Sequence, residues 1–187
     1  SARPSYMATP ASLIPAAAKR FPEAQEQCRA LLKERPADRP AREWLARTTL
    51  WGGDAAAAVP LLEALLKEDF ERPDLWADYV NAAASVPALG LVQLELASRI
   101  AERPVKGQAN PVLFLSRLAW VFVREGKAGG DDALLKRGGL LIDEALAMKP
   151  RQPDERREVA GVLASVGRNK QALALLDGLE ATGAADL

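Results

Sequence analysis

Few residues in this chain have the chemistry that catalysis or metal binding requires. The 187 residues include no histidine and a single cysteine, Cys28. This composition excludes a Ser-His-Asp or Cys-His catalytic arrangement, a His-ligated zinc or haem site, an internal disulfide and a cysteine-rich metal cluster. Cys28 falls in the apolar stripe Ala24-x3-Cys28-x2-Leu31, so we interpret it as a small buried hydrophobic residue.

Carboxylates remain as candidates for acid–base chemistry. Asp131 and Asp132 are adjacent, and the run 154–158 reads Asp-Glu-Arg-Arg-Glu. Both groups fall where helices are expected to start, and acidic side chains there cap the backbone and suit the helix dipole. The glycines at 126, 129, 130, 138 and 139 lack the preceding strand and the Gly-Lys-Ser sequence of a phosphate-binding loop. We therefore expect no catalytic residues, no cofactor and no metal site.

The charge and hydropathy patterns narrow the class of partner. Lys plus Arg equals Asp plus Glu at 25 each, and the two signs alternate along the chain. Nucleic-acid-binding proteins concentrate basic residues on one face, so no nucleic-acid partner is expected. The longest apolar run is far shorter than the ~20 residues of a membrane span, so no transmembrane segment is expected in this chain.

The sequence leaves the cellular compartment open. It starts Ser1-Ala2-Arg3-Pro4 and not with Met, and no basic stretch leads into an apolar one. A signal peptide could have been removed, so both the cytoplasm and the periplasm of a bacterium stay possible. High Ala and Arg usage favours a bacterial source.

The local pattern is helical. Apolar residues recur at spacings of three and four, as in Leu115, Leu118, Ala119 and Phe122. Leu, Ala, Glu, Arg and Lys dominate, and all are good helix formers, whereas strand and hairpin signals are nearly absent. The sequence predicts an all-α protein with about ten helices of 10–18 residues.

Similar helix ends recur at a fixed distance. Leu-Leu-Lys-Glu-Arg-Pro36, Leu-Leu-Lys-Glu-Asp-Phe70 and Arg-Ile-Ala-Glu-Arg-Pro104 are separated by 34 residues each. The next such end, at Pro150, comes 46 residues later. The excess divides into five residues after Pro104 and seven after Gly126. A period of this length indicates a repeat architecture.

The 34-residue period with paired helices resembles the tetratricopeptide repeat. That family places large residues at positions 4, 7, 11 and 24, small ones at 8, 20 and 27, a glycine near 15 and a proline at 32. The last unit fits best, with Val159, Ala160, Leu163, Gly167, Ala172, Leu176 and Leu179 at positions 7, 8, 11, 15, 20, 24 and 27. Small residues at 8 and 20 let the two helices of a hairpin approach closely.

The resemblance implies a fold and a domain organisation. We expect a right-handed superhelical array of about four to five antiparallel hairpins, a TPR-like α-solenoid. A proline-containing, partly ordered lead-in (1–17) would precede a single repeat domain (18–187). Its expected units are 18–37, 38–71, 72–105, 110–151 with an insertion near 127–132, and 152–185.

Four departures from the repeat pattern lead to expectations of their own. Val80 and Val92 are larger than the family's small residues, so the second hairpin should splay. Pro60 should kink its helix or move its start. Pro87 replaces the turn glycine, with Ser85 as the expected N-cap. The insertion near 127–132 should lengthen the second helix of its hairpin or form a flexible, disordered tip.

The resemblance also implies a binding face, because in the family the first helix of each hairpin lines a concave groove. In this register the groove includes Ala84, Ser116, Val123 and Gly161. The side chains with binding chemistry that fall there are Arg47, Trp51, Asn81, Trp120, Arg124 and Arg157. Asn and Arg can hold an extended peptide backbone or an acidic side chain, and Trp adds apolar contact. The alternative is ordinary solvated helix faces, with the tryptophans packed between hairpins. Trp44 and Trp76 are expected in the core.

Three functions are compatible with these sequence features. The first is a non-enzymatic scaffold that binds a partner protein or peptide in the concave groove. The second is a module of a bacterial cell-envelope machine for polysaccharide or protein export, suggested by the likeness of the stretch 50–54 (Leu-Trp-Gly-Gly-Asp) to such proteins. The third, disfavoured by the lack of histidine, is an α/α enzyme that uses carboxylates. The apolar stripe of the hairpin 153–179 adds self-association through the C-terminal end as an open possibility.

Overall fold

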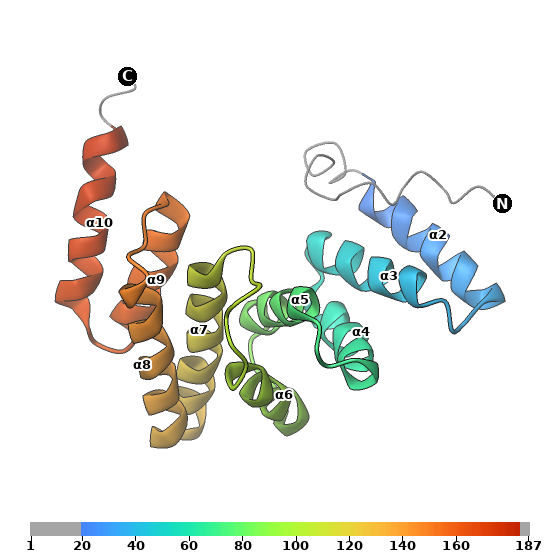
Figure 1. Cartoon of the computed structure of the whole chain (residues 1–187), viewed down its shortest axis with the longest axis horizontal. Helices are drawn as coiled ribbons and strands as arrows, with labels where there is room; N and C mark the ends of the chain where they lie inside the picture. The colour runs from blue at the N-terminus through green and yellow to red at the C-terminus, as the bar shows by residue number, and fades with distance from the viewer. Residues whose placement is uncertain (1–19, 184–187) are drawn as a thin grey trace.

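The computed structural model describes residues 20–183, and the side chains of residues 20–177. This part of the chain forms nine α-helices and no β-strand, which confirms the all-α class. Labelled as in Figure 1, the helices are α2 (Phe21–Glu34), α3 (Arg39–Trp51), α4 (Ala55–Glu68), α5 (Pro73–Ser85), α6 (Leu91–Ala101), α7 (Pro111–Gly129), α8 (Asp132–Ala147), α9 (Pro153–Ser165) and α10 (Asn169–Gly183). The expected lead-in (1–17) lies outside the described residues.

The helices follow one another in chain order along a curved row (Figure 1). Neighbours in sequence pack together as α3 with α4, α7 with α8 and α9 with α10. A second set of contacts joins every other helix, because α5 packs on both α3 and α7, and α7 also packs on α9. The buried side chains form one continuous apolar core from α3 to α10.

Proline and short polar side chains set where most helices begin. Proline occupies the first or second position of α2, α3, α5, α7 and α9, where its missing N–H costs no intrahelical hydrogen bond. Asp38 and Asp54 accept hydrogen bonds from the third residues of α3 and α4 at 2.9 and 3.0 Å. Asn110 and Asp131 cap α7 and α8 in the same way. The similar helix boundaries along the chain therefore arise from similar local chemistry.

The expectation for the insertion near 127–132 is wrong. The added residues extend the first helix of the pair, so that α7 reaches 19 residues, the longest in the described part. Gly130 then ends α7 in the left-handed conformation at φ 64°, and Asp131 caps α8 at once. An ordered glycine C-cap followed directly by an N-cap leaves no room for a flexible tip.

The expectation that Ser85 caps a helix is also wrong, and of the two alternatives expected for Pro60 the shifted helix start is excluded. Ser85 is the last residue of α5, where its hydroxyl donates to the Asn81 carbonyl at 2.8 Å, and it caps no following helix. Gly90 precedes α6 instead. Pro60 does not move the start of α4, because the helix begins at Ala55 with Asp54 as its cap. Pro60 lies in the interior of α4, where the ring removes one backbone hydrogen bond.

The pair α5–α6 makes the sparsest contact of the four pairs α3–α4, α5–α6, α7–α8 and α9–α10. Val80 is fully buried. Val92 is 52% exposed, so it does not lie in the contact between the two helices, where the repeat pattern would place it. The Tyr79 hydroxyl, which donates to the Gln93 carbonyl at 2.8 Å, helps to hold α6 on α5. Leu91, at the start of α6, is 87% exposed.

The third pair shows the opposite extreme, because α7 and α8 cross at a glycine. A Cβ atom added at Gly138 would lie 2.6 Å from Cγ2 of Val123 and 3.0 Å from the Ala119 carbonyl oxygen. Val123 is fully buried in this contact, so its assignment to the concave face is wrong. Gly139, the next residue, has open space around the same position.

Replacing these two glycines by alanine should have opposite effects. Gly139→Ala should stabilise the protein by about 0.5–1 kcal/mol, because alanine lowers the backbone entropy cost of the helix. Gly138→Ala should destabilise it by ~1–3 kcal/mol, because α7 and α8 must move apart. Urea unfolding followed by circular dichroism measures both. Equal stabilities for the two variants would show that the helices do not approach as described.

Candidate functional site

Arg117 links three helices of the array. From α7, its Nη2 lies 2.6 Å from Oε1 of Glu158 in α9, and its Nε lies 3.0 Å from Oε2 of the same carboxylate. Its Nη1 donates to Oδ1 of Asn81 in α5 at 2.6 Å. Bidentate arginine–carboxylate pairs fix geometry as well as charge. The repeat register does not single out Arg117 or Glu158, and their partnership has no sequence signal, since 41 residues separate them.

A hollow of about 400 Å³ opens between α5, α7 and α9 beside this link. Trp120 and Val162 supply its large apolar surface, and Ala84 and Gly161 leave its space open because their side chains are so small. Ala84, Ser116, Trp120 and Gly161 are all positions that the register assigned to the concave face. The structure thus brings together four such positions from three helices.

The polar groups around the hollow are few and already oriented. The Ser116 hydroxyl is buried and donates to the Val112 carbonyl at 2.8 Å. Arg117 and Glu158 form the charged wall and remain about one-third exposed. A hollow with an indole face and a preorganised ion pair can hold an apolar side chain while it offers hydrogen bonds to a peptide backbone.

The Arg124 side chain donates hydrogen bonds to the C-terminal end of α5. Its Nη1 donates to the carbonyl oxygens of Ala83 at 3.1 Å and of Val86, and its Nη2 pairs with Glu125 at 2.7 Å. The side chain is only 13% exposed. Arg124 therefore satisfies carbonyl groups that a helix C-terminus leaves without partners.

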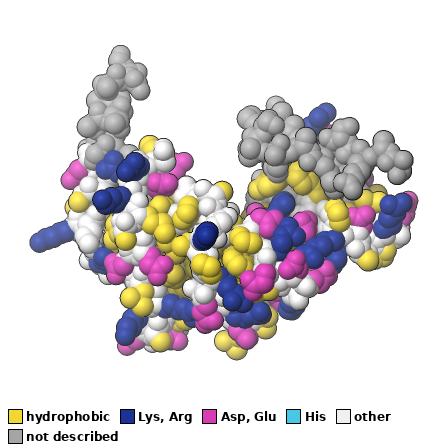
Figure 2. Space-filling model, in the orientation of Figure 1, with side chains coloured by type: hydrophobic (Ala, Val, Ile, Leu, Met, Phe, Trp, Pro, Cys, Tyr) yellow, Lys and Arg dark blue, Asp and Glu magenta, His cyan; other side chains and the backbone are white. Residues whose placement is uncertain are grey.

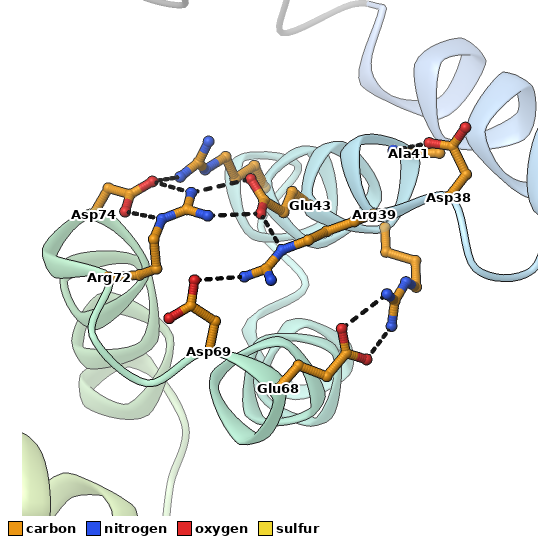
Figure 3. A network of polar contacts seen from close by, with 10 residues as sticks. Asp38, Arg39, Ala41, Glu43, Glu68, Asp69, Arg72 and Asp74 are labelled. Carbon is orange, nitrogen blue, oxygen red and sulfur yellow. Dashed lines mark hydrogen bonds and ion pairs between the residues drawn. The ribbon is translucent and has the colours of Figure 1, made fainter.

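Arg47 belongs to a network of ion pairs between α3 and α5. It contacts Asp74 and Asp78 at 2.7 Å each. Figure 3 shows the neighbouring part, in which Arg72 bridges Glu43 and Asp74 at 3.0 and 2.8 Å. The contacts of Arg47 with both aspartates and of Arg72 with Glu43 cross between α3 and the start of α5, so they hold these two helices together.

The network shifts the pKa of its acids in different directions. Hydrogen bonds from Arg72 and then Arg47 hold the pKa of Asp74 well below its usual value. Burial opposes ionisation of Glu43, but hydrogen bonds from Arg72 and Arg39 outweigh it and lower the pKa of Glu43. Burial dominates at Asp78 and raises its pKa despite the Arg47 contact. All three shifts accompany interhelical packing and need no substrate to explain them.

The tryptophans divide between packing and the hollow. Trp51 meets Trp44 edge to face at 5.7 Å and Phe21 at 6.2 Å, in an aromatic group that joins α2 to α3. Trp44 is half-buried, whereas Trp76 is core as expected, at 4% exposed. Of the four, Trp120 lines the hollow.

The six residues assigned to the concave face therefore lie in three settings. Asn81 accepts a hydrogen bond from Arg117, and Arg117 and Trp120 both line the hollow. Arg47, Trp51 and Arg124 are engaged by other parts of the chain. Arg157 is 62% exposed and contacts Asp154 at 3.2 Å on its own helix. In Figure 2, hydrophobic side chains gather over α7 and α9, and mixed charges cover α3 and α5.

Three comparisons with known proteins found no match to this chain. No family model matches it, and neither a curated protein nor a solved structure does. In the described part, no three Cys, Asp or Glu side chains are grouped so that they could hold a metal ion. No helix between residues 20 and 183 has the length and apolar character to cross a membrane.

Two arginines of the assigned set should respond differently to substitution. Arg124→Ala should lower the free energy of unfolding by about 1–3 kcal/mol, because the part-buried carbonyls at the end of α5 lose a donor and Glu125 keeps only the Leu89 N–H. Arg157→Ala, at an exposed position, should change it by less than about 0.5 kcal/mol. Thermal unfolding of both variants measures this difference. A neutral Arg124→Ala would return Arg124 to the set of groups free to bind a partner.

The ion-pair network should make stability depend on pH. Because Glu43 and Asp74 have lowered pKa values, the stability they supply is present above their ordinary values of 4.5 and 3.8 and is lost as pH falls below them. Asp78, with a raised pKa, opposes this trend. Glu43→Gln should cost roughly 1 kcal/mol at pH 7 and should lose less stability than wild type between pH 6 and 3.5. Urea titrations over this range measure it, and parallel pH curves would contradict the assignment.

Proposed function

We propose that this protein is a non-enzymatic interaction scaffold, a TPR-like array of helix hairpins that binds a partner protein or peptide in its concave groove. The observation that carries the proposal is the hollow between α5, α7 and α9, with Trp120 as its apolar wall and Arg117–Glu158 as its polar one. Aromatic and arginine side chains in a partly enclosed site are typical centres of binding energy.

The packing of the helices supports the same proposal. Because α3, α5, α7 and α9 contact one another in succession, their faces can form one extended surface instead of separate small ones. Such a surface suits an extended chain segment better than a compact ligand. The proposed contacts are Trp120 and Asn81, with Arg117 and Glu158 beside them and Arg157 on the next helix.

Filling the hollow should weaken binding without harming the fold. A Cβ added at Gly161 meets nothing within 4 Å, so the backbone there has room for a side chain, and Gly161→Leu should place its side chain in the hollow. Gly139→Leu is the matched control, because it is also a helix glycine with open space but lies on α8, outside the hollow. Both changes should preserve or raise helix stability.

The measurement is affinity for peptides selected on the wild-type protein from a random linear display library. Gly161→Leu should weaken the selected peptides by at least about tenfold, and Gly139→Leu by less than about twofold. Trp120→Ala should weaken them as well. If no linear peptide is enriched, or if Gly161→Leu binds them as well as Gly139→Leu does, the hollow is not the binding site.

A further inference from the structure

A second hollow lies on the opposite side of α7. It has a volume of about 330 Å³ and lies between the end of α6, the linker that follows and the pair α7–α8. Its α7 wall consists of Phe114, Leu115 and Leu118, whereas Ser116, Arg117 and Trp120 face the first hollow. At about 100° per residue, these two sets point in nearly opposite directions from the helix axis.

Buried apolar side chains form the floor of this hollow, and its accessible surface is polar and apolar in about equal parts. Phe114, Leu115 and Leu118 meet Ile100 of α6 and Leu141 of α8, and the side chains of these five residues are at most 6% exposed. α6 packs on α5, while contact between α6 and the α7–α8 pair is too slight to close the gap. The added linker residues 105–109 bridge this gap along the chain.

The rim of the hollow is acidic. Glu102 and Glu144 both belong to its lining and both are exposed. The C-terminal end of α6, at Ala101, also lies here, and the carbonyl end of a helix favours a cation. No described basic group lies within ion-pair distance of Glu144, and Glu102 has only the long 3.7 Å contact with Arg137.

The basic residues nearby are held by other partners. Arg103 lines the hollow, but its guanidinium pairs with Glu71 at 2.7 Å and lies 5.1 Å from the Phe70 ring centre. Arg137 donates to the Ser98 carbonyl at 2.8 Å and lies over the Phe122 ring. Neither guanidinium is therefore free to fill the hollow or to neutralise its rim fully.

We propose that this hollow is a second docking site, which takes a lysine or arginine side chain from a segment of a partner protein. The methylene stem of such a side chain would lie against Phe114, Leu118 and Leu141, and its cationic head would reach Glu102 and Glu144. Charge complementarity selects this occupant, because an aliphatic or acidic side chain would leave the two carboxylates unpaired or repelled. The inference extends the proposed binding function to another face, and it does not require the first hollow to be occupied.

A pair of peptides that differ in one charge tests the proposal. The probes are acetyl-Ala-Leu-Lys-Leu-Ala-amide and the same peptide with norleucine, which matches the lysine stem but has no ammonium group. Each is titrated into the ¹⁵N-labelled full chain, and amide shifts are followed by NMR. The lysine peptide should shift the amides of Ala101, Val105 and Leu118 saturably, with about tenfold higher affinity than the norleucine peptide.

Variants of the rim separate the charge effect from general stickiness. In Glu102→Gln/Glu144→Gln the two peptides should bind within about twofold of each other, and added salt should then have little effect. Glu26→Gln, an exposed change on α2, should retain the wild-type preference. Both sets of changes are on the surface, so the fold should be unchanged.

Each other outcome overturns the proposal. Equal affinity of the two peptides for the wild-type chain would exclude recognition of a cation. Absence of saturable shifts around the second hollow would exclude docking there, and shifts confined to Trp120 and Gly161 would place all binding at the first hollow. Repeating the titration with Gly161→Leu distinguishes the two sites, because the lysine preference should survive that change.

Discussion

Helix α7 packs against three other helices, α5, α8 and α9. The arrangement of the remaining helices depends on which face of α7 meets each of these three. One face meets α8 at Gly138, where an added methyl group would collide with Val123. Other faces contact α5 and α9. A helix that is apolar over most of its circumference must be covered on most sides. Because α7 is covered in this way, the pairs before and after it are held in one body.

The sharing of the faces of α7 among its neighbours also explains the two hollows described above. Where α7 passes between α5 and α9, Ala84 and Gly161 are too small to fill the space beside Trp120. Where α7 passes α6, the loose packing of α6 leaves a gap beside Leu115 and Leu118 of α7. Small residues and a weakly packed helix thus have the same consequence, because either one leaves a space beside α7 that no side chain fills.

Arginine has a consistent role in this protein, although its individual partners differ. Arg47 joins α3 to α5, Arg117 joins α5, α7 and α9, and Arg124 ties α7 to the end of α5. In each case a long side chain crosses from one helix pair to another and uses several donors at once. These ion pairs and hydrogen bonds join α3, α5, α7 and α9, which contact one another in turn. They therefore stabilise the arrangement of these four helices as well as each single contact.

The helical class and the approximate ends of the helices could be predicted from the order of the residues. These properties depend on local spacing, on proline and on N-capping side chains, all of which act within a few residues. An outward face for Trp120 is implied by the resemblance to the tetratricopeptide repeat, which assigns one face of each first helix to the groove.

The pairing of charged residues and the position of the hollows could not be predicted in this way. Arg117 and Glu158 are far apart in sequence, and nothing local connects them. Arg124 carries the same charge as Arg157, yet one caps a helix and the other is exposed, because only Arg124 lies within reach of the carbonyls of α5. The insertion lengthened α7 because Gly130 and Asp131 together form a C-cap and an N-cap. Side-chain partners across helices depend on distances in the folded chain, which residue types and spacing do not specify.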